Sequence, residues 1–465
     1  MSKQIRLGEN KMGAMPVGKL LLNMALPMII AMLVQALYNV VDSYFVSKMS
    51  DDETIRESAI AAMSLSFAVQ NIKIGTATGL GVGVNALLSK SLGEGNQEKA
   101  NRTAGNGILL ALISTVLFIL FGIFGTSPYF NMMSDNPLTV DFGTTYISII
   151  CIGSLGSFIE ILCERLLQAS GRSFHSMITQ TTGAITNIIL DPCLIFGLGP
   201  FPAMGITGAA VATIIGQWVA GIMALVFNLK FNHDVQFSFR NLKPSKDVLK
   251  PILVVGVPAI IMTSIGSIMN IGINKILQRF TQYGEIPVNV FGIYFKLQSF
   301  FFMPLFGLNN ATISIVAFNY GARKPDRIKK TLKIACAGAL CFMLLGVAVF
   351  QTVPDLLLGI FDDSPAFLEL GCGALRTISL CFPFVAICIV LGASFQALGN
   401  GIYSTIVSLC RQLLVLLPAA YLLSLSGNVN AVWWAFPIAE FVSLATTLLL
   451  FFRIYKQKIK PIEEN

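Results

Sequence analysis

The chain has 465 residues, of which 54% are hydrophobic and only 12% are charged. Soluble globular domains carry about 25% charged residues, so this composition excludes an ordinary soluble protein and indicates many membrane spans. The formal charge of +8 at pH 7 could suit nucleic acid, but the basic residues are distributed as in membrane topology signals, and we expect no nucleic-acid partner.

The apolar residues gather in twelve segments. They are too long for strands and show no strict alternation, and a helix needs about 20 apolar residues to cross a bilayer. We therefore predict an all-α polytopic membrane protein with twelve transmembrane helices. The segments run over 18–46, 59–90, 103–125, 142–168, 174–198, 204–229, 251–280, 288–318, 331–353, 368–396, 402–425 and 430–452.

The first segment carries a polar stripe. Gln35, Tyr38, Asn39 and Asp42 have the spacing i, i+3, i+4 and i+7, which places them on one helix face. An acid at the centre of a membrane helix costs roughly 2.5–3.5 kcal/mol on translocon scales. Asp42 therefore forms either a structural hydrogen bond to a neighbouring helix or an ion or proton site.

Pro27 lies about four turns before Asp42 on the same predicted helix. A proline inside a helix removes a backbone hydrogen bond and favours a kink. We predict a hinge at Pro27, whose bending would move the polar stripe as a unit. A permanent kink that only fits the neighbouring helices is the alternative, and Pro258, in a matching segment without an acid, favours it.

The loops between the segments alternate in charge. The tails and the even-numbered loops are basic, whereas the odd-numbered loops are acidic or uncharged, except the seventh with Lys275 and Arg279. The positive-inside rule then places both termini in the cytoplasm, with the chain in an inner or plasma membrane. The first apolar run is too long for a signal peptide.

The chain contains an internal repeat. A shift of about 228 positions superposes six segments on six, so both halves have the same orientation and an axis along the membrane normal should relate them. We predict a first lobe over 1–230, a linker over 231–250 and a second lobe over 251–465. Matching pairs include Phe67 and Phe295, Gln70 and Gln298, Gly79 and Gly307, Gln168 and Gln396, and, at a slightly different shift, Pro27 and Pro258.

The acids within the segments gather in the first half. Asn187 and Asp191 share a helix face, and with Asp42 and a hydroxyl such as Thr213 they would suit a sodium ion; two facing carboxylates would equally suit a proton. A structural polar cluster is the alternative. Glu160 and Glu164 share another face, where Lys73 or Arg165 could neutralise one of them. We prefer Glu164 as the functional acid. The second half keeps only Glu440, with Lys296 and Arg411 as candidate partners.

Other chemistry is not indicated. No GxxxxGK[ST] motif and no arrangement of a nucleophile with a base occur, so we predict no enzyme and no cofactor. The nine cysteines form no CxxC pair. Gly75, Gly79 and Gly83 form overlapping GxxxG steps typical of close helix packing. A substrate pocket with apolar walls, a few amide side chains and acids on one side would suit amphipathic organic cations. The candidate contacts are Gln35, Tyr38, Asn39, Phe67, Gln70, Phe295 and Gln298.

Together, the P-x11-N-x2-D pattern of the first segment, the LGEGNQEKA loop, the QASGRS turn and NIILDP resemble the MATE (multidrug and toxic compound extrusion) transporters, and within them the MepA-type bacterial multidrug exporters. The resemblance implies two six-helix lobes arranged in a V. It also implies that the protein exchanges cationic drugs or dyes for protons or sodium ions and thereby contributes to antibiotic resistance. The implied protein is a monomer surrounded by membrane lipids. It matches Asp42, Asn187 and Asp191, and less closely Thr213, to the first-lobe cation site, and Glu164 to a MepA-type acid.

The resemblance leaves other functions to weigh. The chain lacks the carboxylates that NorM-type members carry in helices seven and ten, so a cation site in the second lobe is not expected. A flippase for lipid-linked precursors shares the broader architecture, but it should line its cavity with arginine and lysine, whereas the cavity half nearest the repeat motifs here is acidic. A passive channel would not need carboxylates on one side only.

Overall fold

The computed structural model describes residues 10–49 and 52–464, without the side chains of residues 39, 40, 43, 47 and 239. The predicted substrate contact Asn39 therefore lies outside the described side chains. The described residues form helices and turns and contain no strand. The predicted all-α fold is confirmed.

The first half of the chain forms the N-lobe. Its helices are α1 (Lys11–Ala14), α2 (Val17–Ser47), α3 (Glu53–Gly93), α4 (Gln97–Leu120), the π-helical turn η1 (Phe121–Gly125), α5 (Thr126–Met133), α6 (Pro137–Ile152), α7 (Leu155–Ala169), α8 (Ser173–Phe196) and α9 (Ile206–Phe231). A short 3-10 helix, η2 (Phe239–Leu242), lies in the stretch that leads to the second half.

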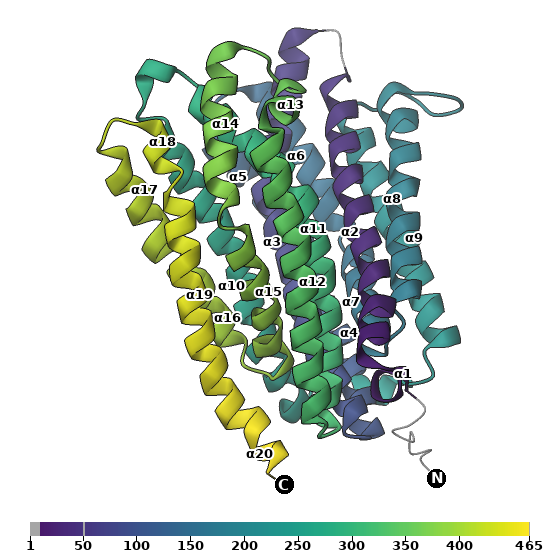
Figure 1. Cartoon of the computed structure of the whole chain (residues 1–465). Coiled ribbons are helices and arrows are strands. Elements are labelled where there is room, and N and C mark those ends of the chain that lie inside the picture. The colour runs from purple at the N-terminus through teal and green to yellow at the C-terminus, as the bar shows by residue number, and fades with distance from the viewer. Residues whose placement is uncertain (1–9, 50–51, 465) are drawn as a thin grey trace.

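The second half forms the C-lobe. Its helices are α10 (Lys246–Leu277), η3 (Thr281–Tyr283), α11 (Ile286–Gly321), α12 (Pro325–Thr352), α13 (Pro354–Gly359), α14 (Pro365–Ser379), α15 (Phe382–Ala397), α16 (Gly401–Leu409), η4 (Cys410–Leu416), α17 (Leu417–Ser424), α18 (Val429–Val432), α19 (Ala435–Ile454), η5 (Tyr455–Ile459) and α20 (Lys460–Glu463). Helices α1 and α20 lie at the same end of the bundle, which we call the terminal end (Figure 1).

Each of the twelve predicted segments corresponds to a helical crossing. Eight helices are long and apolar enough to span a membrane, and the bent pairs α6–α7 and α14–α15 raise the number to ten in the described part of the chain. Helices α3 and α8 are also long enough, at 41 and 24 residues, but they are less apolar. These two helices carry several of the polar side chains discussed below.

The internal repeat extends to the helix boundaries. Helices α4, α6 and α8 begin at Gln97, Pro137 and Ser173, and α12, α14 and α16 begin 228 positions later. The bend between α6 and α7 (49°) recurs between α14 and α15 (45°). The sequence segments 142–168 and 368–396 contain no signal that predicted these bends. The two lobes thus share one architecture in the same orientation.

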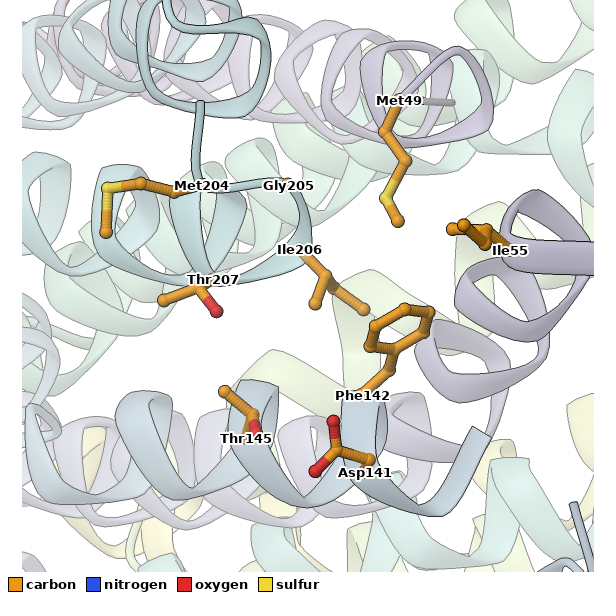
Figure 2. Close-up of a pocket in the computed structure, with 9 residues that line it drawn as sticks. All are labelled: Met49, Ile55, Asp141, Phe142, Thr145, Met204, Gly205, Ile206 and Thr207. Carbon is orange, nitrogen blue, oxygen red and sulfur yellow. The ribbon is translucent and has the colours of Figure 1, made fainter. Parts of the chain in front are cut away.

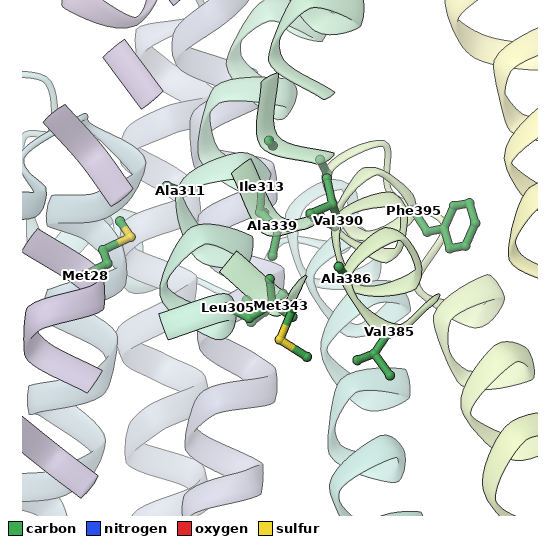
Figure 3. Close-up of a cluster of buried hydrophobic side chains, with 14 of the residues drawn as sticks. Met28, Leu305, Ala311, Ile313, Ala339, Met343, Val385, Ala386, Val390 and Phe395 are labelled. Carbon is green, nitrogen blue, oxygen red and sulfur yellow. The ribbon is translucent and has the colours of Figure 1, made fainter. Parts of the chain in front are cut away.

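Glycines allow the two lobes to approach closely. A Cβ on Gly79 of α3 would lie 2.8 Å from the carbonyl oxygen of Gly256 in α10, and one on Gly83 would collide with the carbonyl oxygen of Ile252. The packing interpretation of the GxxxG steps is therefore confirmed. The main apolar core then continues through α2, α11, α12 and α15, which contribute Met28, Leu305, Met343 and Val385 among others (Figure 3).

The lobes pack together at the terminal end and separate towards the other end. Residues 81–89 of α3 and 310–319 of α11 are buried on all sides. The opposite halves of the same helices expose side chains, including Phe67 on α3 and the polar Asn289 and Lys296 on α11. Since polar side chains avoid the lipid core, this exposed face belongs between the lobes. The structure is closed at the terminal end.

We predict that Gly83→Ala destabilises the protein. The added methyl group meets backbone of α10, which cannot rotate away, and overpacking of this kind costs about 1–3 kcal/mol. Gly338→Ala is the control, because no atom lies within 4 Å of a Cβ there and alanine favours a helix by up to about 1 kcal/mol over glycine. Thermal unfolding in detergent should give a lower midpoint for Gly83→Ala only; equal midpoints would contradict the packing argument.

Candidate functional site

Three helices bring four of the predicted residues together. Asp42 comes from α2, Asn187 and Asp191 from α8, and Thr213 from α9. All four side chains are buried, with exposed fractions of 8%, 3%, 0% and 4%. Asp42 and Asp191 are close enough for a hydrogen bond between their carboxyl groups. The predicted meeting of these residues is therefore present.

Asn187 holds Asp191 in place. With the Asn187 amide oriented to satisfy both neighbours, its nitrogen donates to Asp191 Oδ2 at 2.9 Å. Its oxygen accepts from the backbone N–H of Thr213 at 3.1 Å. The Thr213 hydroxyl lies 3.3 Å from the same amide and donates to the backbone carbonyl of Ala209 at 3.0 Å. These contacts join α8 to α9 directly behind the acids.

Each acid retains one oxygen without a partner. Asp42 Oδ1 and Asp191 Oδ1 are buried and accept no hydrogen bond from the described residues. Buried acceptors without donors are unfavourable, and two carboxyl groups in contact require a proton or a cation between them. The arrangement is therefore suited to a proton or to a small hard cation such as sodium, which takes carboxylate, amide and hydroxyl oxygens.

A second layer of polar contacts lies beside the acids. Gln180 of α8 donates to Gln35 Oε1 of α2 at 2.8 Å. Tyr38 faces Thr213 closely enough for a side-chain hydrogen bond. On α3, Gln70 donates to the hydroxyl of the fully buried Tyr146 at 3.4 Å. Tyr146 was not predicted, because its counterpart in the repeat is not a polar residue and it lies in an apolar run.

Glu164 lies apart from this cluster. Its Oε1 accepts a hydrogen bond from Thr179 at 3.1 Å. Thr179 precedes Asn187 by eight residues on α8, which is about 12 Å along the helix axis. The structure thus places the five predicted cation-coupling residues in two groups, one of four residues and Glu164 alone, nearer the terminal end.

The expected neutralisation of Glu160 and Glu164 is not seen in the described part of the chain. Arg165 donates to Gln168 at 3.0 Å, and Lys73, only 2% exposed, has no hydrogen-bond partner among the described residues. Neither glutamate forms an ion pair there. Lys73 is near enough to Glu160 to influence it electrostatically.

The remaining predicted substrate contacts lie on α3 and α11. Phe67 on α3 is 64% exposed. Phe295 on α11 is half-buried, with its ring centroid 5.0 Å from that of Phe291. Gln298, one turn further along α11, is half-buried. The structure does not place these three in contact with the acids.

The C-lobe handles its buried acid differently. Glu440 of α19 pairs with Arg411 of η4 at 3.3 Å, as the sequence suggested, whereas Lys296 is exposed and has no ion pair among the residues described. Pro27 lies within the uninterrupted helix α2, and Pro258 within α10. The lobes therefore share a backbone plan but differ in charge.

A cavity of about 330 Å³ opens at the end opposite the terminal end. Figure 2 shows Asp141 and Thr145 of α6 on one wall, facing Met204 and Ile206 from the other side. None of the predicted site residues lines it. The described residues contain no group of three or more His, Cys, Asp or Glu side chains that could hold a metal ion.

A bundle of two similar six-helix lobes, in which the buried acids of one lobe have no ion pair among the described residues and the buried acid of the other is paired with an arginine, fits a membrane transporter. A sequence model of the MatE family matches residues 27–193 and again residues 258–422. The chain therefore belongs to the MATE family, and the resemblance found in its motifs is confirmed. As members of this family are transporters, the prediction that it is not an enzyme is confirmed as well.

Two curated relatives and one solved structure illustrate this kinship. The chain is 27% identical to the FAD transporter of Shewanella oneidensis over 91% of this chain and 92% of that protein. It is 24% identical to the multidrug export protein MepA of Staphylococcus saprophyticus over 93% of each chain. A crystal structure of MATE in complex with MaL6 superposes with a TM-score of 0.89, at 24% identity and with full coverage of both chains.

Proposed function

We propose that the protein is a multidrug antiporter that exports amphipathic organic cations in exchange for protons or sodium ions. The observation that carries this proposal is the contact between Asp42 and Asp191, buried within the N-lobe, each with one oxygen that lacks a partner among the described residues. A cation that binds there removes an unfavourable charge. The C-lobe offers no such site, because Arg411 already neutralises Glu440.

Coupling follows from competition for the same region. Tyr38 touches the cation cluster and belongs to the helix face that we assign to the drug, together with Gln35. A cation at Asp42 then weakens drug binding, and drug binding weakens cation binding by the same factor, because linkage is reciprocal. A membrane potential of about 100 mV supplies roughly 2.3 kcal/mol for each charge that crosses.

The substrate class rests on charge. A positively charged drug is attracted by the buried acids and by aromatic faces such as Phe67. The relatives named for multidrug export support this class. The relative named as an FAD transporter and the exposed Lys296 favour an anionic dinucleotide as a second candidate. Proteoliposomes with separately imposed proton and sodium gradients, offered either a cationic dye or FAD, would distinguish the two substrates and identify the ion.

We also propose that the terminal end faces the cytoplasm, because the basic loops lie there. In intact cells, a cysteine at Asp363 should react with a membrane-impermeant thiol reagent, and one at Lys243 should not. Both positions are exposed, so a difference in labelling reports the side of the membrane. Permeabilised cells should label both variants equally. Labelling at 243 in intact cells would refute this orientation.

Removing either acid of the cluster should uncouple transport. We predict that Asp42→Asn and Asp191→Asn each lower gradient-driven dye efflux from proteoliposomes at least about tenfold, since one unneutralised charge accounts for several kcal/mol. Asp141→Asn is the matched control, because that acid lies in the separate cavity. Wild-type efflux by both cluster variants would show that coupling lies elsewhere, and unfolding of all three would be detected by size-exclusion chromatography.

Pro27→Ala tests the hinge. If bending at Pro27 links the cation cluster to the drug contacts, the variant should still bind dye in detergent, but the dependence of its dye affinity on pH or sodium should become shallower. Pro258→Ala is the control at the equivalent position of the C-lobe, where the helix carries no acid between the proline and its C-terminal end. A variant at Pro27 that keeps the full ion dependence would make this proline a packing feature.

A further inference from the structure

A second cavity, of about 290 Å³, lies in the C-lobe between α12 and the C-terminal helices. Leu332 and Cys336 of α12 and Phe451 and Ile459 of the C-terminal helices contribute to its apolar walls. Leu391, Tyr455 and two exposed lysines, Lys329 and Lys333, complete the lining. We call this cavity the C-lobe groove. Unlike the cavity beside Asp141, it contains no acid among its lining residues.

Glu463 fixes one side of the groove through an ion pair and hydrogen bonds. Its carboxylate pairs with Lys329 Nζ at 2.8 Å, and the Tyr455 hydroxyl donates to its two oxygens at 3.0 and 3.2 Å. These contacts attach the C-terminal turn to α12 and neutralise Lys329. Lys333, one helical turn further along, forms no ion pair with the residues described, so its charge remains available.

The groove lies where a membrane helix changes from apolar to basic. Its lysines belong to the first three turns of α12, whose span runs over Pro325–Thr352, and its far wall belongs to the last turns of the span Val429–Glu463. The half-buried Cys336, Phe451 and Tyr455 leave apolar surface open at this depth, which apolar groups must cover, and an excess of lysine beside it attracts anionic headgroups. The same lysines repel a cationic drug.

We propose that the C-lobe groove holds part of an acyl chain of an anionic phospholipid, whose phosphate pairs with Lys333. The volume suits a segment of one chain rather than a whole lipid. The apolar walls bind the chain, the lysine selects the anionic headgroup, and the bound lipid wedges α12 against the C-terminal helices. This inference is independent of the transported substrate and of the coupling ion.

Native mass spectrometry of the full-length protein in detergent tests the proposal with phosphatidylglycerol and phosphatidylcholine of identical chains. The wild-type protein should retain one phosphatidylglycerol molecule about fivefold more tightly than phosphatidylcholine, the effect of one lysine near a headgroup. Lys333→Gln should abolish this preference. Lys230→Gln, which removes an exposed lysine from the N-lobe, should preserve it.

A second variant tests the apolar part of the groove. Cys336→Trp fills the cavity and should weaken the binding of both lipids at least about tenfold, since it removes the surface that a chain covers. Cys341→Trp, on an exposed part of the same helix, should bind as the wild type does. Retained preference in Lys333→Gln, or retained binding in a Cys336→Trp protein with an unchanged unfolding midpoint, would overturn the proposal.

Discussion

The structure depends on two carboxyl groups held together where water is scarce. Asp42 and Asp191 reach each other from α2 and α8, and Asn187 fixes one of them by hydrogen bonding. In a medium of low dielectric constant, such a pair persists only when a proton or a cation is shared or when the helices move apart. The occupancy of the site and the packing of the N-lobe are therefore linked, which is the requirement for a protein that exchanges one solute for another.

The internal repeat makes the difference between the lobes informative. Both halves use the same helix boundaries and the same bend, so architecture alone does not explain why only one half carries unpaired acids. In the C-lobe, Arg411 neutralises Glu440 through Oε1, while Oε2 accepts no hydrogen bond from the described residues, and an acid neutralised by arginine does not need the charge of an external ion. The C-lobe thus provides a fixed partner, against whose helix α10 the glycines of α3 pack tightly. A transporter needs such a contact to be close in one state and breakable in another.

Much of the fold could be predicted from the sequence because its signals are local. Runs of apolar residues indicate the crossings, and the shift of 228 positions indicates the repeat. The bends after Ile152 and Ser379 were not predicted, because a straight helix and a bent pair of helices have the same run of apolar residues. The site was predicted in part: spacing places Asn187 and Asp191 on one face, but only the packing of α8 against α2 brings Asp42 to them. The separation of Glu164 and the contact of Gln70 with Tyr146 depend on packing that no spacing reveals.

The two prolines show how one motif can serve two purposes. Pro258 cannot donate to the carbonyl of Val254, and α16 packs against this carbonyl: a Cβ on Gly401 would lie 2.8 Å from that oxygen. The carbonyl of Pro258 also accepts a hydrogen bond from Thr405 at 3.1 Å. The backbone around Pro258 is therefore held in place by contacts from α16.

Pro27 stands on a helix that carries the acid of the cluster and that also packs against the other lobe, since a Cβ on Gly307 of α11 would lie 2.8 Å from the backbone nitrogen of Ile29. About 22 Å of α2 separates it from Asp42, so a small change of angle at Pro27 moves the acid and the polar stripe over a much larger distance than it moves the terminal end. The terminal end of the bundle is the tightly packed one, with α3 and α11 buried on all sides. Motion that starts at Pro27 is therefore directed away from the closed interface and towards the half of the N-lobe that holds the acids. The hinge that we propose at Pro27 would let the occupancy of Asp42 change the position of the polar stripe while the glycine-packed interface stays closed.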